Sequence, residues 1–418
     1  ERTSTTVIDA YVKGVAEGYL DQLSDGLKQR GYANRLFVML SNGGTATADT
    51  AKRVPVQIVE SGPAAGVEAA SYFGRLMDIN QMLSFDMGGT TAKLCIIEDG
   101  RAARTRNFEV DRVHRFKAGS GLPAAVPVYD LLEIGAGGGS IARVNDLGLL
   151  QVGPDSASSE PGPASYGLGG SLPTVTDADL LLGYLNPDYF LGGQMRLDSS
   201  AAHSAVSDNL SDATGLTPIA AAAGVHELVN ENMASAARMY VAEKGQAPSK
   251  LSLVAFGGAG PLHGVALAET VAAREALVPP APGINAATGL LATDMQYEFT
   301  RSALISISEA DQSELDALNG QLDELVAQAG EALAADGVAP EERKFTRIAE
   351  CRYQGQGFEL RAEFPEGVVG GDNKQVLIDN FHESHRRDYG HAFDDQNIEI
   401  ITLRVIAAAA ADKLIWPK

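Results

Sequence analysis

Apolar side chains recur at helical spacing near the start of the chain, at Val7, Tyr11, Val15 and Tyr19. This periodicity predicts one long amphipathic helix over residues 6–30.

The next segments alternate between short apolar runs and glycine-containing turns. A run at 36–40 predicts a strand that leads into the turn Ser41-Asn42-Gly43-Gly44. The pattern is helical again over 61–77, with Pro63 in the first turn, where proline is tolerated. Apolar runs then flank Asp86-Met87-Gly88-Gly89-Thr90, which predicts a strand–turn–strand unit.

The region 115–200 is rich in Gly, Pro, Ser and Asp and holds few long periodic segments. Apolar residues keep returning in it, for example Val126 and Ile141, so we expect an irregular insertion packed on a core. A helix is expected over 219–244, followed by a strand at 251–256.

The glycine turn 257–260 opens a further helix that begins near Pro261. A strand at 276–278 and a helix from about residue 286 complete this section.

The pattern changes from about residue 301. The expected elements there are two helical stretches within 308–337, strands near 345–353 and 357–364, a helix at 373–388 and a last strand at 398–408. We therefore expect an α/β protein in three parts. These are a connecting region over 1–80, a core over 81–300 and a separate C-terminal α/β domain over 301–418.

Charge narrows the classes of partner. The 418 residues include 54 acidic and 33 basic ones, for a formal net charge of −21. Such a chain repels phosphate backbones and anionic lipid, so we expect no nucleic-acid or membrane partner. Two cysteines, Cys95 and Cys351, provide neither a disulfide framework nor a thiolate metal cluster, which is typical of the reducing cytoplasm.

Asp86 and the glycines that follow it form the strongest chemical motif. A hairpin tip made of Gly88 and Gly89 exposes backbone N–H groups that can surround a phosphate. The Asp86 carboxylate can hold Mg²⁺ or orient a nucleophile, and the hydroxyls of Thr90 and Thr91 add donors. The alternative is an ordinary hairpin whose glycines only relieve the turn.

A second glycine turn joins a strand to a helix at Gly257-Gly258-Ala259-Gly260. A helix N-terminus of this kind seats phosphates or the adenosine beside them. The turn is neither a Rossmann fingerprint nor a P-loop, and alone it is a weak match.

Two further segments are candidates for ligand binding. Gly137, Gly138, Gly139 and Ser140 can form an anion nest that faces substrate, or a tight entry into a strand. Asp177 and Asp179 lie where a helix begins, so each either caps that helix or binds metal; we assign Asp177 to the metal.

The histidines are ambiguous. His382 and His385 lie three residues apart on an expected helix, with His391 beyond them, and a solvated helix face is favoured over a metal site. His263 either contacts nucleotide or packs as a hydrogen-bonded core residue, and Trp416 is a candidate partner contact.

The order of the motifs resembles the two-lobed, ribonuclease-H-like fold of sugar kinases, seventy-kilodalton heat-shock chaperones and actin. In that fold a connecting helix, a second phosphate loop, an adenosine loop and a second connecting helix follow one another. Here the corresponding segments begin at Glu60, at Asp86, at Gly257 and at Ala286.

One family of this superfamily is similar over nearly the whole chain, the hydantoinase A/5-oxoprolinase family. The resemblance lies in SNGG (41–44), ESGPAAG (60–66), FDMGGTT (85–91), EIGAGGGSIA (133–142), VGPDSASSEPGPASYG (152–167), PTVTDADLLLGYL (173–185), AFGGAGPLHG (255–264) and RYQGQGFEL (352–360). It implies ATP-dependent activation of a carbonyl compound, with Mg²⁺, a B-type partner subunit and a small-molecule substrate.

Within this resemblance, Asp86, Thr90 and Thr91 are the expected catalytic residues, and the two glycine turns are expected to hold ATP. Opening of a hydantoin, 5-oxoproline or lactam ring is the first expectation, and ATP-dependent ketone carboxylation is the same-fold alternative. A chaperone- or actin-like ATPase switch is a different class, which the long glycine-rich insertion disfavours.

The sequence departs from the family at two positions. Many relatives carry a hydroxyl residue and then an acid after the hairpin, where this chain has Ala92 and Lys93, so Lys93 either neutralises phosphate charge or points to solvent. Ser165 replaces a frequent cysteine, which excludes a thiol nucleophile there.

The superfamily's cleft needs a phosphate loop from each lobe, and the only Asp-x-Gly-Gly-Thr motif lies at 86–90. We therefore expect an N-terminal lobe that precedes Glu1, as a separate chain or a removed segment, and we expect residues 1–418 alone to be catalytically incompetent.

Overall fold

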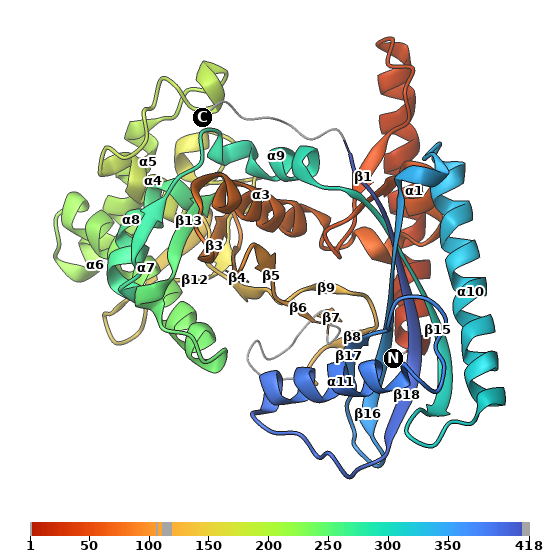
Figure 1. Cartoon of the computed structure of the whole chain (residues 1–418). Coiled ribbons are helices and arrows are strands. Elements are labelled where there is room, and N and C mark those ends of the chain that lie inside the picture. Colours follow the sequence, from red (N-terminus) through yellow and green to blue (C-terminus); the bar gives the residue numbers. More distant parts are fainter. Residues whose placement is uncertain (1, 106–107, 111–118, 412–418) are drawn as a thin grey trace. The chain divides into compact units, whose positions relative to one another are not determined.

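A computed structural model describes residues 2–105, 108–110 and 119–411. The chain falls into two compact units (Figure 1). Unit 1 comprises Glu1–Gln22, Met39–Gly43 and Val54–Ala292, and unit 2 comprises Leu23–Val38, Gly44–Arg53 and Thr293–Lys418. This division differs from the three expected parts, because two segments before residue 54 belong with the C-terminal residues.

Unit 1 is built on a six-stranded mixed sheet in the order β10-β4-β3-β13-β14, with β5 paired to β4. Its strands are β3 (Gln81–Met87), β4 (Ala92–Glu98), β5 (Arg101–Ala102), β10 (Leu132–Ile134), β13 (Ser252–Phe256) and β14 (Glu275–Leu277). β3 pairs antiparallel with β4 and parallel with β13, which places the expected hairpin beside the strand that precedes the second glycine turn. The expected α/β class is confirmed.

Alternation along the strands places apolar side chains on both faces of this sheet. Phe85 and Met87 pack in one core with Val229 of helix α7 (Pro218–Glu243). Phe256 packs in a second core with α3 (Ser61–Met77) on the opposite face. The site strands are therefore fixed by helices on both sides.

The remaining elements of unit 1 lie before, within and after the insertion. They are α1 (Arg2–Gln29, which runs on into unit 2), β6 (Arg104–Thr105), β7 (Phe108–Val110), β8 (Leu122–Ala124), β9 (Val128–Tyr129), β11 (Ser140–Val144), β12 (Leu150–Ser156), α4 (Val175–Leu181), α5 (Ser199–Val206), α6 (Asp212–Thr214), α8 (Gly260–Val271) and α9 (Asn285–Ala292). Two short antiparallel pairs, β6 with β9 and β7 with β8, join the segment before the insertion to the insertion, and β11 pairs with β12 within it.

Helices α3 and α9 approach each other so closely that no side chain fits at Gly289. A Cβ atom there would lie 1.7 Å from the carbonyl oxygen of Ala65 and 2.9 Å from the backbone nitrogen of Ala69.

We therefore expect Gly289→Ala to lower the free energy of unfolding by about 1–3 kcal/mol, since the two helix backbones must separate. Denaturant unfolding measures this. Gly320→Ala is the control, because Gly320 is also helical but has nothing within 4 Å of its Cβ position. That change should leave stability equal or higher. Equal effects of the two changes would contradict the close contact.

Unit 2 is built on a six-stranded sheet in the order β1-β2-β15-β18-β16-β17. Its elements are β1 (Phe37–Met39), β2 (Thr45–Thr47), α2 (Ala48–Arg53), β15 (Met295–Ser306), α10 (Gln312–Ala335), β16 (Arg343–Tyr353), β17 (Leu360–Glu363), α11 (Lys374–Tyr389) and β18 (Ile398–Ala409). The two helical stretches expected within 308–337 form the single helix α10. β15 already begins at Met295, before the expected boundary at residue 301.

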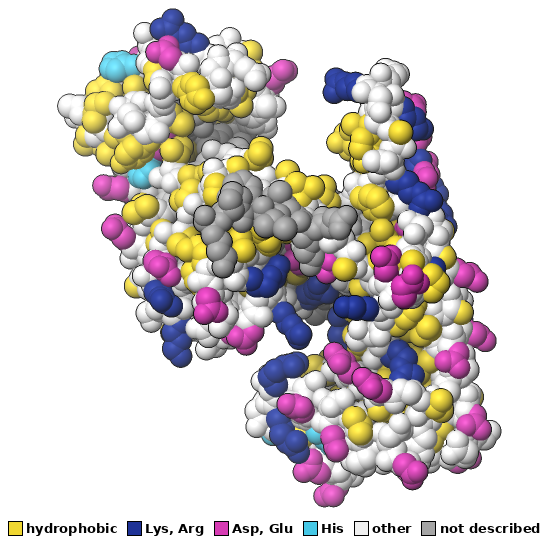
Figure 2. All heavy atoms as spheres, turned by 45° about the horizontal axis from the view of Figure 1, so that its top comes forward, with side chains coloured by type: hydrophobic (Ala, Val, Ile, Leu, Met, Phe, Trp, Pro, Cys, Tyr) yellow, Lys and Arg dark blue, Asp and Glu magenta, His cyan; other side chains and the backbone are white. Residues whose placement is uncertain are grey.

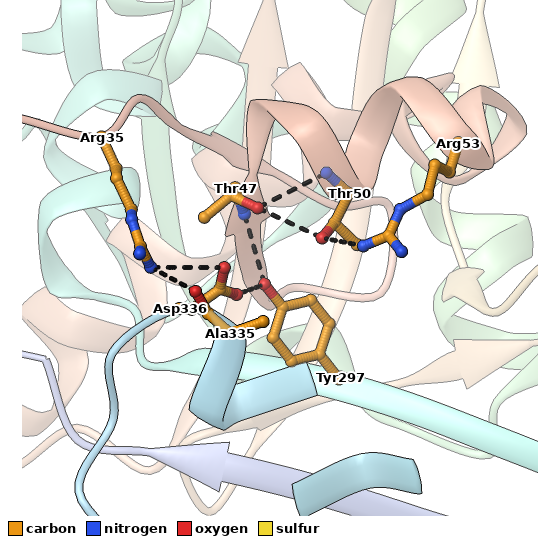
Figure 3. A network of polar contacts seen from close by, with 7 residues as sticks. All are labelled: Arg35, Thr47, Thr50, Arg53, Tyr297, Ala335 and Asp336. Carbon is orange, nitrogen blue, oxygen red and sulfur yellow. Dashed lines mark hydrogen bonds and ion pairs between the residues drawn. The ribbon is translucent and has the colours of Figure 1, made fainter. Parts of the chain in front are cut away.

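A polar network explains why residues from the first part of the chain belong to unit 2 (Figure 3). Arg35 donates to the carbonyl oxygen of Ala335 at 2.7 Å, and the Thr47 N–H donates to the Tyr297 hydroxyl at 3.3 Å. That hydroxyl also contacts Asp336. Burial, with the Asp336 carboxylate, raises the pKa of Tyr297 to about 12.

On the face shown in Figure 2, acidic and basic side chains are scattered among apolar ones. Among the described helices, none combines the length and the apolar character that crossing a membrane requires.

Candidate active site

Asp86 lies near the end of β3, where its carboxylate is surrounded by backbone. A Cβ on Gly257 would lie 2.3 Å from its Oδ1 atom, and a Cβ on Gly66 would lie 3.6 Å from its Oδ2 atom. Gly66 is on α3, and Gly257 opens the second glycine turn with φ +87°. Two of the sequence motifs therefore meet at this carboxylate.

Burial raises the pKa of Asp86, and the nearby ammonium of Lys93 opposes this shift only in part. Lys93 is the cross-strand partner of Asp86, but its Nζ atom lies 2.8 Å from the Glu60 carboxylate, just before α3. Their side chains are 17% and 18% exposed. Lys93 is thus held in an ion pair and does not point freely to solvent, which was one of the two expectations.

The hairpin tip and the second glycine turn are joined by backbone hydrogen bonds. The Gly88 N–H donates to the Thr91 carbonyl at 3.0 Å and closes the tip. The Ala259 N–H donates to the Met87 carbonyl at 2.9 Å. The second of these bonds sets the two expected nucleotide-binding segments side by side.

The tip of the Asp86 hairpin and part of the second glycine turn are exposed. Gly89, Thr90 and Gly258 are exposed, and Cβ atoms placed on Gly89 or Gly258 would have nothing within 4 Å. By contrast, Ala259 and Gly260 are buried. The open glycines border space large enough for a ligand to approach the backbone.

The third glycine segment, 137–140, packs directly on the hairpin tip. The N–H groups of Gly138 and Gly139 donate to the carbonyls of Gly88 and Gly89, at 3.0 and 2.7 Å. The Gly137 N–H donates to the Ser140 hydroxyl, and the Ser140 N–H donates to the Gly137 carbonyl. All four N–H groups thus serve protein acceptors, which favours a supporting function over the expected anion nest.

Asp177 is the buried third residue of α4, and it forms a capping box with the N-cap residue Thr174. Its Oδ2 atom accepts from the N–H groups of Thr174 and Ala164, at 3.0 and 3.2 Å, and its Oδ1 atom accepts from the Ser165 N–H at 2.8 Å. Both oxygens are used, so the expected metal role is replaced by a structural one. The Ser165 side chain is itself buried.

A hollow of about 290 Å³ lies in the insertion, next to the glycine segment. It is lined by Ile141, Ser156, Ala157, Ser158, Glu160, Pro161, Gly162, Gly169, Gly170, Ser171 and Leu172. The Ala157 N–H donates to the Gly139 carbonyl at 2.9 Å, which connects this wall to the segment that supports the hairpin tip.

The sequence profile described as hydantoinase/oxoprolinase matches residues 2–299. The chain belongs to the hydantoinase/oxoprolinase family. The family resemblance inferred from the motifs is confirmed.

Of three relatives of this hydantoinase/oxoprolinase chain, the two whose names give an activity differ in that activity. An uncharacterized protein of Methanocaldococcus jannaschii is 39% identical over 97% of the chain and 58% of the relative. The caprolactamase subunit alpha of Pseudomonas jessenii is 31% identical over 100% of the chain and 59% of that subunit. A nucleotide-free structure of acetone carboxylase superposes with a TM-score of 0.85 at 26% identity, over 100% of this chain and 59% of that one. The chain thus spans less than two thirds of each of these relatives.

Elsewhere in this hydantoinase/oxoprolinase chain, the C-terminal histidines are not on a solvated face, as the sequence favoured. His382 and His385 are buried against Tyr353 in unit 2, and His382 Nδ1 lies 2.8 Å from the Tyr353 hydroxyl. His385 Nδ1 lies 2.6 Å from the carbonyl oxygen of the exposed His391. Tyr353, which packs against both rings, lies on β16, so the spacing of residues along α11 does not reveal this contact. Trp416 lies outside the described residues.

Sequence reasoning missed one buried polar cluster in this family member. Asp179 on α4, His226 on α7 and His263 on α8 meet in unit 1. His263 is therefore a core residue, and its Nε2 atom lies 3.2 Å from the carboxylate of Asp179, which is distant in the sequence. Asp179 in TVTDAD and His263 in AGPLH stand out in the sequence as polar residues among apolar ones. Nothing in the sequence indicates that they are neighbours in the fold.

Proposed function

We propose that this chain is the ATP-dependent subunit of an enzyme that activates a cyclic amide for hydrolytic opening. The observation that carries the proposal is the half-buried Asp86 carboxylate, held against the turn that presents exposed Gly258 and beside exposed Gly89 and Thr90. Caprolactamase subunit alpha, which matches the whole chain, supports the choice of a cyclic amide.

Phosphorylation makes chemical sense for such a substrate. An amide carbonyl is a poor electrophile, and transfer of a phosphoryl group to its oxygen converts that oxygen into a good leaving group. Gly88, Gly89, Thr90 and Thr91 would hold the transferred phosphate end, and Gly257, Gly258, Ala259 and Gly260 the adenosine end. The hollow beside Gly139 has room for a small ring.

The surroundings of Asp86 suit Mg²⁺. Burial raises the pKa of this carboxyl. The positive charge of Lys93 offsets that shift only in part, and Lys93 is already paired with Glu60. A bound Mg²⁺ would supply that charge and neutralise the phosphates of ATP. Asp86 would hold the ion directly or through water.

The motif order also supports a ribonuclease-H-like fold for the lobe that contains these segments. A B-type subunit is the proposed partner, in line with relatives that are themselves subunits. The ATPase subunit of a ketone carboxylase is the second candidate, and the acetone carboxylase structure, with its TM-score of 0.85, favours it.

Substrate-dependent ATP hydrolysis separates the two candidates. The chain, within its complete polypeptide and together with a B-type subunit, is assayed with hydantoins, 5-oxoproline, lactams and ketones, each with and without bicarbonate. We expect a cyclic amide to stimulate ADP release with ring opening. Stimulation by a ketone only when bicarbonate is present, with a carboxylated product, would replace the proposal with the carboxylase alternative.

Gly258→Val should weaken ATP binding at least about tenfold with little loss of thermal stability. Nothing lies within 4 Å of a Cβ at Gly258, so the fold accommodates the side chain, which then occupies the space of the nucleotide. Titration with a fluorescent ATP analogue measures binding. Gly371→Val is the matched control, because Gly371 is also exposed with nothing within 4 Å of its Cβ position. Unchanged ATP affinity in the Gly258 variant would show that the turn is structural only.

A further inference from the structure

Asp179, His226 and His263 come from three different helices and offer ligand atoms that all lie within 4.8 Å of one another. All three residues are buried. This cluster lies within unit 1, and none of its three residues is among those that the proposed function assigns to ATP or Mg²⁺.

The contact between Asp179 and His263 is not an ordinary hydrogen bond. Asp179 Oδ2 and His263 Nε2 are 3.2 Å apart, yet neither atom has a hydrogen-bond partner of good geometry among the described residues. The side chains are 1% and 0% exposed, so water does not satisfy them from outside. Buried polar atoms without hydrogen-bond partners require an explanation, and an ion bound by both atoms is one.

The separation matches a pair of metal ligands. Bonds of about 2.0–2.2 Å at the tetrahedral angle place two ligand atoms on Zn²⁺ about 3.4 Å apart. On the other side of the carboxylate, Asp179 Oδ1 and His226 Nδ1 are 2.8 Å apart, and a small opening of that contact would admit the ion.

Neighbouring groups orient the imidazole of His263 as a ligand. Its Nδ1 atom lies 3.0 Å from the Asn230 Oδ1 atom, one helical turn after His226 on α7. Donation of the Nδ1 proton to this oxygen leaves the Nε2 lone pair free for a cation. An ordered partner of this kind is typical of metal-ligating histidines.

A buried carboxylate that lies between two imidazoles is a ligand set that one divalent cation can share. Access is from the side of His226, whose side chain is 10% exposed and packs beside the ring of the exposed Tyr184.

We propose that Asp179, His226 and His263 form a binding site for a divalent transition metal of the Zn²⁺ class. Two imidazoles and one carboxylate are ligands that such ions share. The site ties α4, α7 and α8 together, and its existence does not depend on the proposed function.

The test uses Zn²⁺ as the probe. The protein is stripped with a chelator and titrated with Zn²⁺ against a chromophoric competitor, and bound metal is counted by elemental analysis. We expect one Zn²⁺ per chain and a rise in the melting temperature when Zn²⁺ is added. His226→Ala should bind Zn²⁺ at least about tenfold more weakly and lose that rise.

Two further variants make the result decisive. His226→Gln keeps a hydrogen-bonding group towards Asp179 but is a poor Zn²⁺ ligand, so it distinguishes a metal site from a purely hydrogen-bonded network. His203→Ala changes an exposed histidine on α5 and should bind Zn²⁺ as the unchanged protein does. Equal Zn²⁺ affinity and stabilisation in the unchanged protein and in His226→Gln would overturn the proposal.

Discussion

Asp86→Asn should reduce ATP turnover at least about a hundredfold while leaving the protein as stable as before, or more stable. The catalytic loss follows because the neutral amide no longer anchors Mg²⁺ or the acceptor beside the phosphates. The stability follows from the electrostatics, because burial raises the pKa of Asp86 and its ionised form therefore opposes folding.

The sign of this effect fixes its pH dependence. Above the folded-state pKa, Asp86 is ionised in both the folded and the unfolded chain, and the full destabilisation is present. Below the unfolded value of about 3.9, it is protonated in both states and the destabilisation is gone. The melting-temperature advantage of Asp86→Asn should thus be largest at neutral pH and should shrink as the pH falls.

Steady-state ATPase assays and thermal melts across pH check both halves of this expectation. Asp146→Asn, which changes an exposed acid in the turn between β11 and β12, should alter neither turnover nor stability. Near-normal turnover in a folded Asp86→Asn protein would remove Asp86 from the catalytic machinery. A large drop in melting temperature would instead mean that the carboxylate supports the fold.

Gly257→Ala should abolish ATP turnover and also destabilise unit 1. The methyl group would lie 2.3 Å from Asp86 Oδ1 and 2.5 Å from the Met87 carbonyl oxygen, so the carboxylate and the hairpin must move. The backbone there has φ +87°, which adds about 1–2 kcal/mol of strain for alanine.

Gly245→Ala separates the two causes. Gly245 has φ +68° but nothing within 4 Å of its Cβ position, so alanine there carries the backbone strain without the overlap. It should lower stability by a similar strain but leave ATP turnover intact. If Gly257→Ala lost no more activity than this control, the close contact with Asp86 would have no catalytic significance.

The sequence was most informative where chemistry follows one continuous segment. Strand and turn patterns located the Asp86 hairpin and the 257–260 turn, and the parallel pairing of β3 with β13 brings the two together. Phe85 and Phe256, each in a strand, have the alternation that places them in the two cores.

It was least informative where partners are distant in the sequence. The ion pair of Lys93 with Glu60 replaces the solvent-exposed position that was one expectation for Lys93, because the start of α3 comes close to β4 only in the folded unit. For the same reason, the sequence does not predict that Arg35 and Thr47 form hydrogen bonds with residues after 293.

The hairpin tip is fixed almost wholly by main-chain groups, through Gly138 and Gly139 on one side and Ala259 on the other. Main-chain bonds are the same whatever side chains the residues carry. Natural variation can therefore change exposed side chains around this tip, and in the neighbouring insertion, without loosening it, provided that glycine is kept where backbones touch. Under the proposed function, point mutations around such a tip can exchange one substrate for another while the residues that hold the nucleotide are kept.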